Sequence, residues 1–295
     1  MPSKYSIKDL ERLTGIKAHT LRIWEQRYEI LNPERTDTNI RYYSNTDLKR
    51  ILNISLLNNN GYKISSIAKL SHDHLLQAVG KILNNCLRES DQIENLVLCM
   101  MDLDEEKFEK IITRSILNFG FENTIEKIIF PFLRHLGNIW QVGIIGSAQE
   151  HYISNLIRQK LIAGIDKLKI QTKPDSKTYL FFLPNEELHE IGLLYLYYLT
   201  KARGHKCLYL GQSLPVEDLI SISKSAAPDF VVCVLTTNTP SLQMNSFLLT
   251  CEEQIQGADF LMSGRLLLSN SCESPQIPSS RFKIFENFEN YKKWI

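Results

Sequence analysis

The sequence contains no run of about eighteen apolar residues, the length that a membrane-spanning helix needs. Its first residues, MPSKYSIKDLE, also lack the hydrophobic segment of an export signal. Apolar residues make up 43% and charged residues 23% of the 295 residues, which is ordinary for a globular protein with room for two or three domains. We therefore expect a cytoplasmic protein with no membrane association.

Closely spaced cysteines are missing too. The six cysteines have neither metal-clip nor redox-motif spacing, and lie at Cys86, Cys99, Cys207, Cys233, Cys251 and Cys272. We expect them to be reduced thiols. His72 and His74 lie close together, but no third metal ligand is nearby, so we interpret this segment as a polar linker. Internal repeats and low-complexity segments are absent as well.

The net charge of +1 hides an uneven distribution of charge along the chain. Residues 1–72 hold 12 Lys and Arg against 7 Asp and Glu, which leaves 22 basic and 26 acidic residues in the remainder. A basic module joined to a mildly acidic body is expected when one part of a chain binds nucleic acid. A helical cap with scattered surface Lys and Arg would show a similar excess, but it would leave the turn-rich segment after residue 30 unexplained.

The first two patterns of apolar residues predict short helices joined by a tight turn at Gly15. They consist of Ile7, Leu10, Leu13 and Ile16, and then of Leu21 and Trp24. The second helix carries side chains that can reach phosphates and base edges: Lys17, His19, Thr20, Arg22 and Arg27. A turn-rich segment follows and holds Arg35, Asn39, Arg41, Tyr42 and Tyr43. This order predicts a helix-turn-helix with a β-wing that reads duplex DNA.

The segment resembles the MerR family of transcription regulators over about 70 residues, through the LRIWE of its second helix and the Arg-Tyr-Tyr of its wing. Many members have Gly where this chain has Asn39, which tolerates the same left-handed backbone. The resemblance implies phosphate contacts from Arg22, Arg27, Tyr28, Arg41 and Tyr42, and base contacts from Lys17, His19 and Thr20. Arg35 and Asn39 complete the predicted DNA-binding set, whereas we expect Trp24 and Tyr43 to belong to the core.

The remaining chain predicts two further domains. A capped helix after Ser44, a stop at Gly61 and a helix from Ile64 complete the DNA module. Helical spacing, with breaks at 102–104 and 118–120, then predicts a bundle of about four helices. From about residue 175, strands alternate with helices, which predicts a Rossmann-like, doubly wound parallel sheet that ends in a last strand and turn. We expect domains at 1–74, 75–172 and 175–295.

Two short motifs carry possible cofactor chemistry. Glu187, His189 and Gly192 form Glu-x-His-x-x-Gly just after the first strand of the sheet, at the edge where such folds bind ligands. A histidine there can offer one ring nitrogen to a metal, and the glycine leaves room for a bulky group. In the bundle, nine residues separate Trp140 from Glu150 and His151. Alone, each motif is also compatible with an ordinary core tryptophan and surface histidines.

Together, the two motifs resemble the cobalamin-dependent photoreceptor branch of the MerR family, the CarH and LitR type. In that branch, a bundle with the Trp-(nine residues)-Glu-His motif caps the upper face of cobalamin, and an Asp/Glu-x-His-x-x-Gly loop holds the lower face. The resemblance implies that His189 is the lower axial cobalt ligand and that Trp140 packs on the upper axial group. Glu150 and His151 would lie beside that group, and His151 would reach cobalt once it leaves.

Two positions depart from the pattern of cobalamin-binding domains. A Ser-x-Leu usually follows the third strand, but its Ser position falls on Val234, or on Cys233 one residue earlier. A Gly-Gly usually follows the fourth strand, where this chain has Ser263 and Gly264. Two alternatives follow: the nucleotide tail of cobalamin binds more loosely, or this chain has lost the cofactor and kept the fold.

The sequence therefore predicts a DNA-binding transcription regulator, a repressor by resemblance, that is controlled by cobalamin in its carboxyl-terminal domains. The resemblance implies adenosylcobalamin, a light response, a homo-oligomer, and a location on the bacterial nucleoid. The first alternative is a regulator without cobalamin that senses another ligand or a protein partner. The second is a cobalamin enzyme, which the DNA module and the missing substrate domain oppose.

Overall fold

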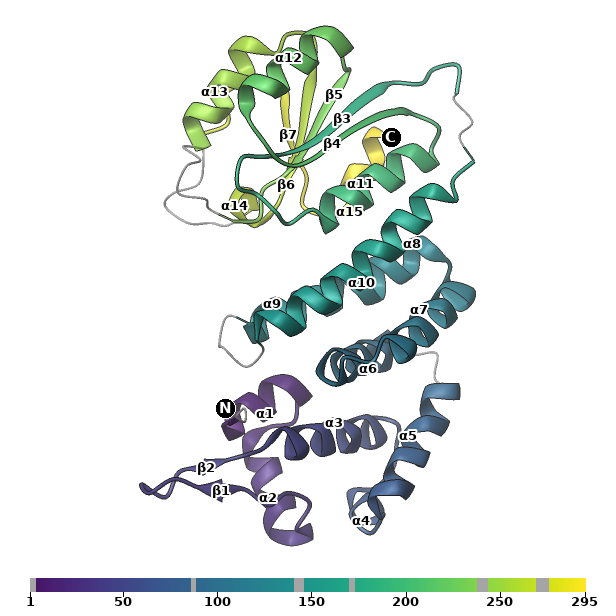
Figure 1. Ribbon diagram of the computed structural model, residues 1–295, viewed down its shortest axis with the longest axis vertical. Helices are drawn as coiled ribbons and strands as arrows, with labels where there is room; N and C mark the ends of the chain where they lie inside the picture. The colour runs from purple at the N-terminus through teal and green to yellow at the C-terminus, as the bar shows by residue number, and fades with distance from the viewer. Residues whose placement is uncertain (1–3, 86–88, 141–145, 170–172, 238–243, 269–275) are drawn as a thin grey trace. The chain divides into compact units, whose positions relative to one another are not determined.

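We describe the fold from a computed structural model, over residues 4–85, 89–140, 146–169, 173–237, 244–268 and 276–295 (Figure 1). The chain divides into two compact units, Met1–Asn155 and Leu156–Ile295, and each is described by itself. None of the helices in these ranges is long and apolar enough to cross a membrane.

The first unit begins with a winged helix-turn-helix. Helices α1 (Ile7–Thr14) and α2 (Ala18–Tyr28) are joined at Gly15, whose backbone is left-handed with φ 71°. The wing consists of β1 (Glu34–Arg35) paired antiparallel with β2 (Arg41–Tyr42), and Asn39 turns between them with φ 65°. The predicted turn at Gly15 and the left-handed Asn39 are both confirmed.

Three helices complete this module: α3 (Asn45–Asn59), α4 (Ile64–Ile67) and α5 (His72–Asn85). Ser44 begins α3 with a reciprocal capping box to Asp47, as expected from the sequence. The prediction of a polar linker at His72 and His74 is wrong, because both residues lie in the first turn of α5. Ser71 Oγ accepts the backbone N–H of His74 at 3.3 Å and so caps the helix that the linker prediction missed.

The bundle helices follow with the breaks that the sequence predicted. They are α6 (Glu89–Asp102), α7 (Glu105–Phe119), α8 (Phe121–Thr124), α9 (Phe130–Trp140) and α10 (Ser147–Asp166). A π-helical turn at Ile125–Ile129 joins α8 to α9, which the sequence pattern does not reveal. The boundary between the two units falls inside α10.

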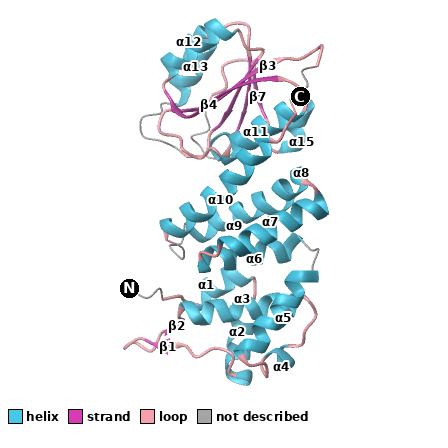
Figure 2. Cartoon of the chain, turned by 45° about the vertical axis from the view of Figure 1, so that its right-hand side comes forward, coloured by secondary structure: helices cyan, strands magenta, loops and turns pink. Residues whose placement is uncertain are grey.

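The second unit is a five-stranded, fully parallel sheet in the order β4-β3-β5-β6-β7. The strands are β3 (Thr178–Pro184), β4 (Lys206–Leu214), β5 (Phe230–Val234), β6 (Asp259–Ser263) and β7 (Phe282–Ile284). Helices α12 (Val216–Ala226) and α13 (Met244–Gln254) cover one face, and α11 (Ile191–Ala202) and α15 (Phe288–Tyr291) cover the other (Figure 2). From β3 the chain passes first to β4 on one side and then to β5 on the other side of β3. The topological switch point therefore lies between β3 and β5, and the carboxyl ends of these two strands form the expected ligand edge.

The core explains why these strands lie in the middle of the sheet. Alternating residues of β3, β5 and β6 pack on α12 and α13, among them Phe182, Cys233 and Met262. The residues between them face the other helix layer, so both sides of each strand are apolar, as is typical of a parallel sheet covered on both faces. Helix α13 begins at Met244, and the six residues before it lie outside the described ranges.

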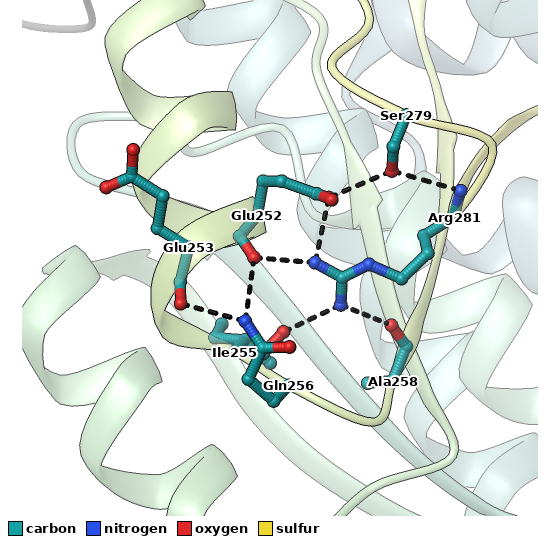
Figure 3. A network of polar contacts seen from close by, with 7 residues as sticks. All are labelled: Glu252, Glu253, Ile255, Gln256, Ala258, Ser279 and Arg281. Carbon is teal, nitrogen blue, oxygen red and sulfur yellow. Dashed lines mark hydrogen bonds and ion pairs between the residues drawn. The ribbon is translucent and has the colours of Figure 1, made fainter.

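The last strand is fastened to the sheet domain by Arg281 (Figure 3). Its guanidinium donates to the carbonyl oxygens of Glu252, Ile255 and Ala258 at 2.6–3.2 Å, and it pairs with the Glu252 carboxylate at 2.8 Å. The unsatisfied carbonyls at the end of α13 thereby gain donors. The turn expected after β7 is instead helical, with α15 followed by a 3-10 turn at Lys292–Trp294, because Asn287 caps α15 by accepting the N–H of Asn290.

Candidate functional site

The ten residues predicted to bind DNA all lie on α2, just before it, or on the wing of one module. Six of them are exposed: Lys17, His19, Arg22, Arg27, Arg35 and Asn39. The other four are half-buried: Thr20, Tyr28, Arg41 and Tyr42. Trp24 and Tyr43 are buried, with 9% and 0% of their surface exposed, which confirms that they belong to the core.

Glu25 ties the wing to α2. One of its carboxylate oxygens accepts from Arg41 Nε at 3.0 Å, and the other accepts from Tyr43 OH at 2.9 Å. Burial and the hydrogen bond to Glu25 raise the pKa of Tyr43, so this hydroxyl stays protonated and remains a donor. Glu25 was not among the site residues predicted from the sequence, although a lone acid in the middle of a basic helix is a usable signal.

Shorter contacts within the wing fix its tip. Arg35 Nη1 donates to Asn39 Oδ1 at 2.6 Å, and the Tyr42 hydroxyl donates to Glu34. The ammonium group of Lys4 lies 4.2 Å from the centre of the Tyr42 ring, within cation–π range. The wing is therefore held in one shape in which basic side chains remain on its surface.

The second candidate site is the loop between β3 and α11. Its histidine, His189, keeps 57% of its side chain exposed, while Glu187 two residues earlier is 1% exposed. Glu187 Oε1 lies 2.7 Å from His189 Nδ1 and also accepts the backbone N–H of His189 at 3.0 Å. The other oxygen, Oε2, accepts the backbone N–H groups of Thr236 and Thr237 at 2.9 and 2.8 Å.

These contacts determine the charge of Glu187. Burial alone would raise the pKa of this carboxyl, but the hydrogen bonds from His189, Thr237 and Thr236 outweigh it and lower the pKa to about 2. A carboxylate that is ionised can only accept, so His189 Nδ1 carries the proton. In the neutral imidazole, the lone pair then lies on Nε2, the nitrogen suited to a metal.

The end of β4 braces the backbone of the same loop. Gln212 Nε2 donates to the carbonyl of Leu188 at 2.5 Å, and the Ser213 N–H donates to the carbonyl of Glu187 at 3.3 Å. Glu186 adopts φ 65°, and its N–H donates to Ser213 Oγ at 3.0 Å. The loop is thus fixed by strands β4 and β5 on both sides of β3.

The four remaining candidates of the sheet lie at the ends of strands or at the start of α11. A Cβ placed on Gly192 would lie 3.6 Å from Val234 Cγ1, so Val234 borders the room that Gly192 was expected to leave. Ser263 Oγ donates to the carbonyl of Phe285 at 2.7 Å, toward β7. Gly264 has φ 114°, and a Cβ there would lie 2.2 Å from the carbonyl oxygen of Leu235, so only glycine fits.

The candidates for the upper face belong to the other unit. Trp140 is the last residue of α9, and its side chain lies outside the described part of the chain. Glu150 and His151 lie in the first turns of α10, where Glu150 Oε2 is 3.1 Å from His151 Nδ1. Ser154 Oγ donates to the other Glu150 oxygen at 2.7 Å, and 73% of the His151 side chain is exposed.

The donor set limits which metal the loop can serve. Within the described residues, no group of three or more His, Cys, Asp or Glu side chains could hold a metal ion. A protein zinc site needs three or four such ligands, so a bare ion does not fit. One oriented imidazole does fit an octahedral cobalt whose equatorial positions are filled by its own corrin ring. His189 is thus compatible with cobalamin.

Family models match two parts of the chain. Residues 5–73 match the MerR HTH family regulatory protein, and residues 92–163 match the B12 binding domain. The second match covers the bundle helices from α6 to α10, while the sheet lies outside it. The chain therefore combines a MerR-type helix-turn-helix with a B12-binding-type helical region.

Two curated relatives span most of the chain. The HTH-type transcriptional repressor CarH of Myxococcus xanthus is 26% identical over 233 residues, 77% of this chain and 77% of the relative. The HTH-type transcriptional repressor CarA of the same organism is 27% identical over 231 residues, 76% of this chain and 74% of the relative. Both are repressors, which favours a regulator over an enzyme.

The fold is shared with a solved corrinoid protein. The monomethylamine corrinoid protein of Methanosarcina barkeri superposes with a TM-score of 0.56 and 13% identity, over 70% of this chain and 98% of that one. The predicted order of a winged helix-turn-helix, a helical region and a parallel sheet is confirmed, and so is the resemblance to CarH-like regulators. The roles of the individual site residues stay predictions.

Proposed function

We propose that this protein is a DNA-binding transcription regulator whose operator affinity is set by cobalamin, with His189 as the lower axial ligand of cobalt. The observation that carries the proposal is the pairing of His189 Nδ1 with the buried, ionised Glu187 at 2.7 Å. An ordinary surface histidine is not expected to pair with a buried carboxylate, least of all one that accepts two backbone N–H groups from the end of another strand. This arrangement instead orients a ring and fixes its tautomer, which is what a metal ligand requires.

Two sets of residues would hold the cofactor in this proposal. Glu187 fixes the tautomer of His189 that carries the lone pair on Nε2. Gly264 lets the backbone after β6 approach the backbone of Leu235 after β5, and these two strand ends would border the nucleotide tail. Trp140, Glu150 and His151 would cover the upper face, as the sequence resemblance implies. Bound as adenosylcobalamin, the cofactor supplies a cobalt–carbon bond that light can break.

The DNA side of the function would lie on α2 and the wing. Lys17, His19 and Thr20 would face bases, and exposed arginines, with Arg22 foremost, would hold phosphates. Glu25 contacts no DNA in this proposal; it keeps Arg41 and the wing in register with α2. Because Arg41 also pairs with Glu25, its contribution to phosphate binding depends on that carboxylate.

Cobalamin can control DNA binding only if it binds one arrangement of the protein more tightly than another. Coupling of this kind changes affinity by about 5- to 150-fold in typical cases. We propose that one of the two arrangements is a homo-oligomer. One small module reads a single half-site, so a palindromic operator needs two copies of the chain. The sign of regulation follows the named relatives, which are repressors.

An absorption titration tests the cofactor assignment. The parent, His189→Ala and His205→Ala are each incubated with adenosylcobalamin in the dark, freed of unbound ligand, and scanned in the visible range. His205 is a matched control, because it lies in the same unit but just before β4, at the opposite end of the strands. We expect colour and an imidazole-coordinated spectrum in the parent and His205→Ala, and loss of that spectrum in His189→Ala.

A regulator without cobalamin is the second candidate, and one observation favours it. Val234 stands where the resemblance expects a hydroxyl, and it lies against the space beside Gly192. Such a protein would keep its DNA binding and its fold but sense another ligand or a protein partner. A parent that stays colourless after incubation supports this candidate and overturns the first.

A further inference from the structure

Helix α10 holds the His189 loop through one buried carboxylate. Glu190 directly follows His189 in the chain, begins α11, and has a side chain that is only 7% exposed. Its Oε1 accepts from Arg158 Nε of α10, and its Oε2 accepts from Tyr209 OH of β4 at 2.9 Å. A single side chain beside the proposed cobalt ligand therefore joins a helix to a strand.

We propose that Arg158 is a positioning residue, and that the Arg158–Glu190 ion pair transmits the state of the cobalamin site at His189 to α10. This inference rests on the proposed function, and it concerns how that function is regulated. It adds a residue that neither cofactor motif contains, since Arg158 lies outside the Glu-x-His-x-x-Gly loop and beyond the Glu150–His151 pair.

The energetics make this contact sensitive to small movements. A carboxylate in a nearly buried position is stable only while its charge is compensated, and Arg158 is the cation that the structure places against it. A backbone shift at His189 moves Glu190, because the two residues are adjacent in the chain. The Leu194 N–H donates to the Glu190 carbonyl at 2.8 Å and so joins Glu190 to α11. Arg158 must then follow the carboxylate or lose its partner.

Helix α10 carries Arg158 and His151 on the same face. Arg158 lies seven residues after His151, and seven residues are close to two helical turns, so the two side chains emerge from one face of α10. Helix α10 thus bears His151 near its start, and its Arg158 contacts Glu190, the residue after His189. The bond from Tyr209 comes from the sheet instead and does not involve α10.

The test uses the full chain and four variants. They are Arg158→Gln, which removes the charge; Arg158→Lys, which restores it; Tyr209→Phe, which removes the other bond to Glu190; and Arg158→Gln with Glu190→Gln, which leaves no buried charge unpaired if the single variant folds poorly. Hydrogen exchange of the loop at 185–192 is measured without cobalamin. The factor by which adenosylcobalamin changes operator affinity is then measured in the dark.

We expect faster exchange of the loop in Arg158→Gln and in the double variant, near-parent exchange in Arg158→Lys, and little change in Tyr209→Phe. The cobalamin-dependent factor should fall by about threefold or more in the first two, with cobalamin-free operator affinity and the imidazole spectrum retained. An unchanged factor in a folded Arg158→Gln or double variant overturns this inference alone. A parent that binds no cobalamin overturns the proposed function and this inference with it.

Discussion

His189 and Glu187 form a pair in which one partner is exposed and the other is almost fully buried. Their side chains approach to 2.7 Å between Nδ1 and Oε1, and 57% of the histidine side chain is exposed against 1% for the glutamate. The buried charge is compensated by N–H groups from the end of β5, which lie 49 and 50 residues further along the chain. The histidine is therefore oriented by the sheet and remains accessible.

This pair predicts a pH-dependent stability. The pKa of Glu187 is lowered from 4.5 to about 2 in the folded protein, so its charge stabilises the fold above about pH 4.5. That contribution, on the order of 3 kcal/mol, is lost progressively as the pH falls from about 4.5 toward 2. We expect Glu187→Gln to lower the free energy of unfolding near pH 6, with a difference from the parent that shrinks as pH falls through this window. Denaturant titrations at several pH values measure it, and a constant difference would contradict the assignment.

Gly264 predicts a large and local loss of stability. In Gly264→Ala, the new Cβ would meet the Leu235 carbonyl oxygen at 2.2 Å, and φ 114° is a strained backbone for alanine. We expect a loss of about 3 kcal/mol or more in the free energy of unfolding. Gly257→Ala is the matched control, since φ is 83° and no atom lies within 4 Å of the added Cβ. It should cost about 1 kcal/mol; equal losses would show that close approach at Gly264 is not the cause.

Arg22→Ala should weaken operator binding. Arg22 is exposed on α2, and we propose that its guanidinium contacts a phosphate. Each phosphate contact contributes roughly one unit to the slope of log affinity against log salt. We expect lower affinity and a slope that is shallower by about one. Lys224→Ala, an exposed cation on α12 of the other unit, should leave both quantities unchanged. A parent-like slope in Arg22→Ala would remove this residue from the DNA surface.

Glu25→Gln separates positioning from simple charge. Removing a negative charge from a DNA-binding surface should by itself strengthen binding to any DNA. The structure predicts the opposite for the operator, because the ion pair with Arg41 at 3.0 Å holds the wing on α2. We expect operator affinity to fall several-fold while affinity for unrelated DNA stays equal or rises. Fluorescence anisotropy with both DNAs measures this ratio, and tighter operator binding would exclude the positioning role.

The sequence predicted several elements whose backbone is decided by local chemistry. Ser44 and Asp47 predicted the start of α3, and Asn39, which tolerates a left-handed backbone, predicted the wing turn. The last segment and residues 72–74 were predicted wrongly, because the caps at Asn287 and Ser71 were not weighed. Local rules also placed His189 on the correct edge of the sheet.

The partners of the site residues were out of reach for a physical reason. Thr236 and Thr237 meet Glu187 only because β5 lies beside β3, and Arg158 meets Glu190 across 32 residues. Such contacts depend on strand order and helix packing, and the spacing of residues within a short motif does not predict either. The role of Glu25 could have been predicted, because it is a single acidic residue among the basic residues of α2 in the sequence.

The central claim is that cobalamin bound at His189 changes the affinity of this protein for its operator. The most direct measurement is the operator dissociation constant of the full chain in the dark, with and without adenosylcobalamin, for the parent and His189→Ala. We expect the constant of the parent to change by at least about fivefold, and that of His189→Ala to stay the same in both conditions. Equal constants for the parent with and without the cofactor would contradict the account.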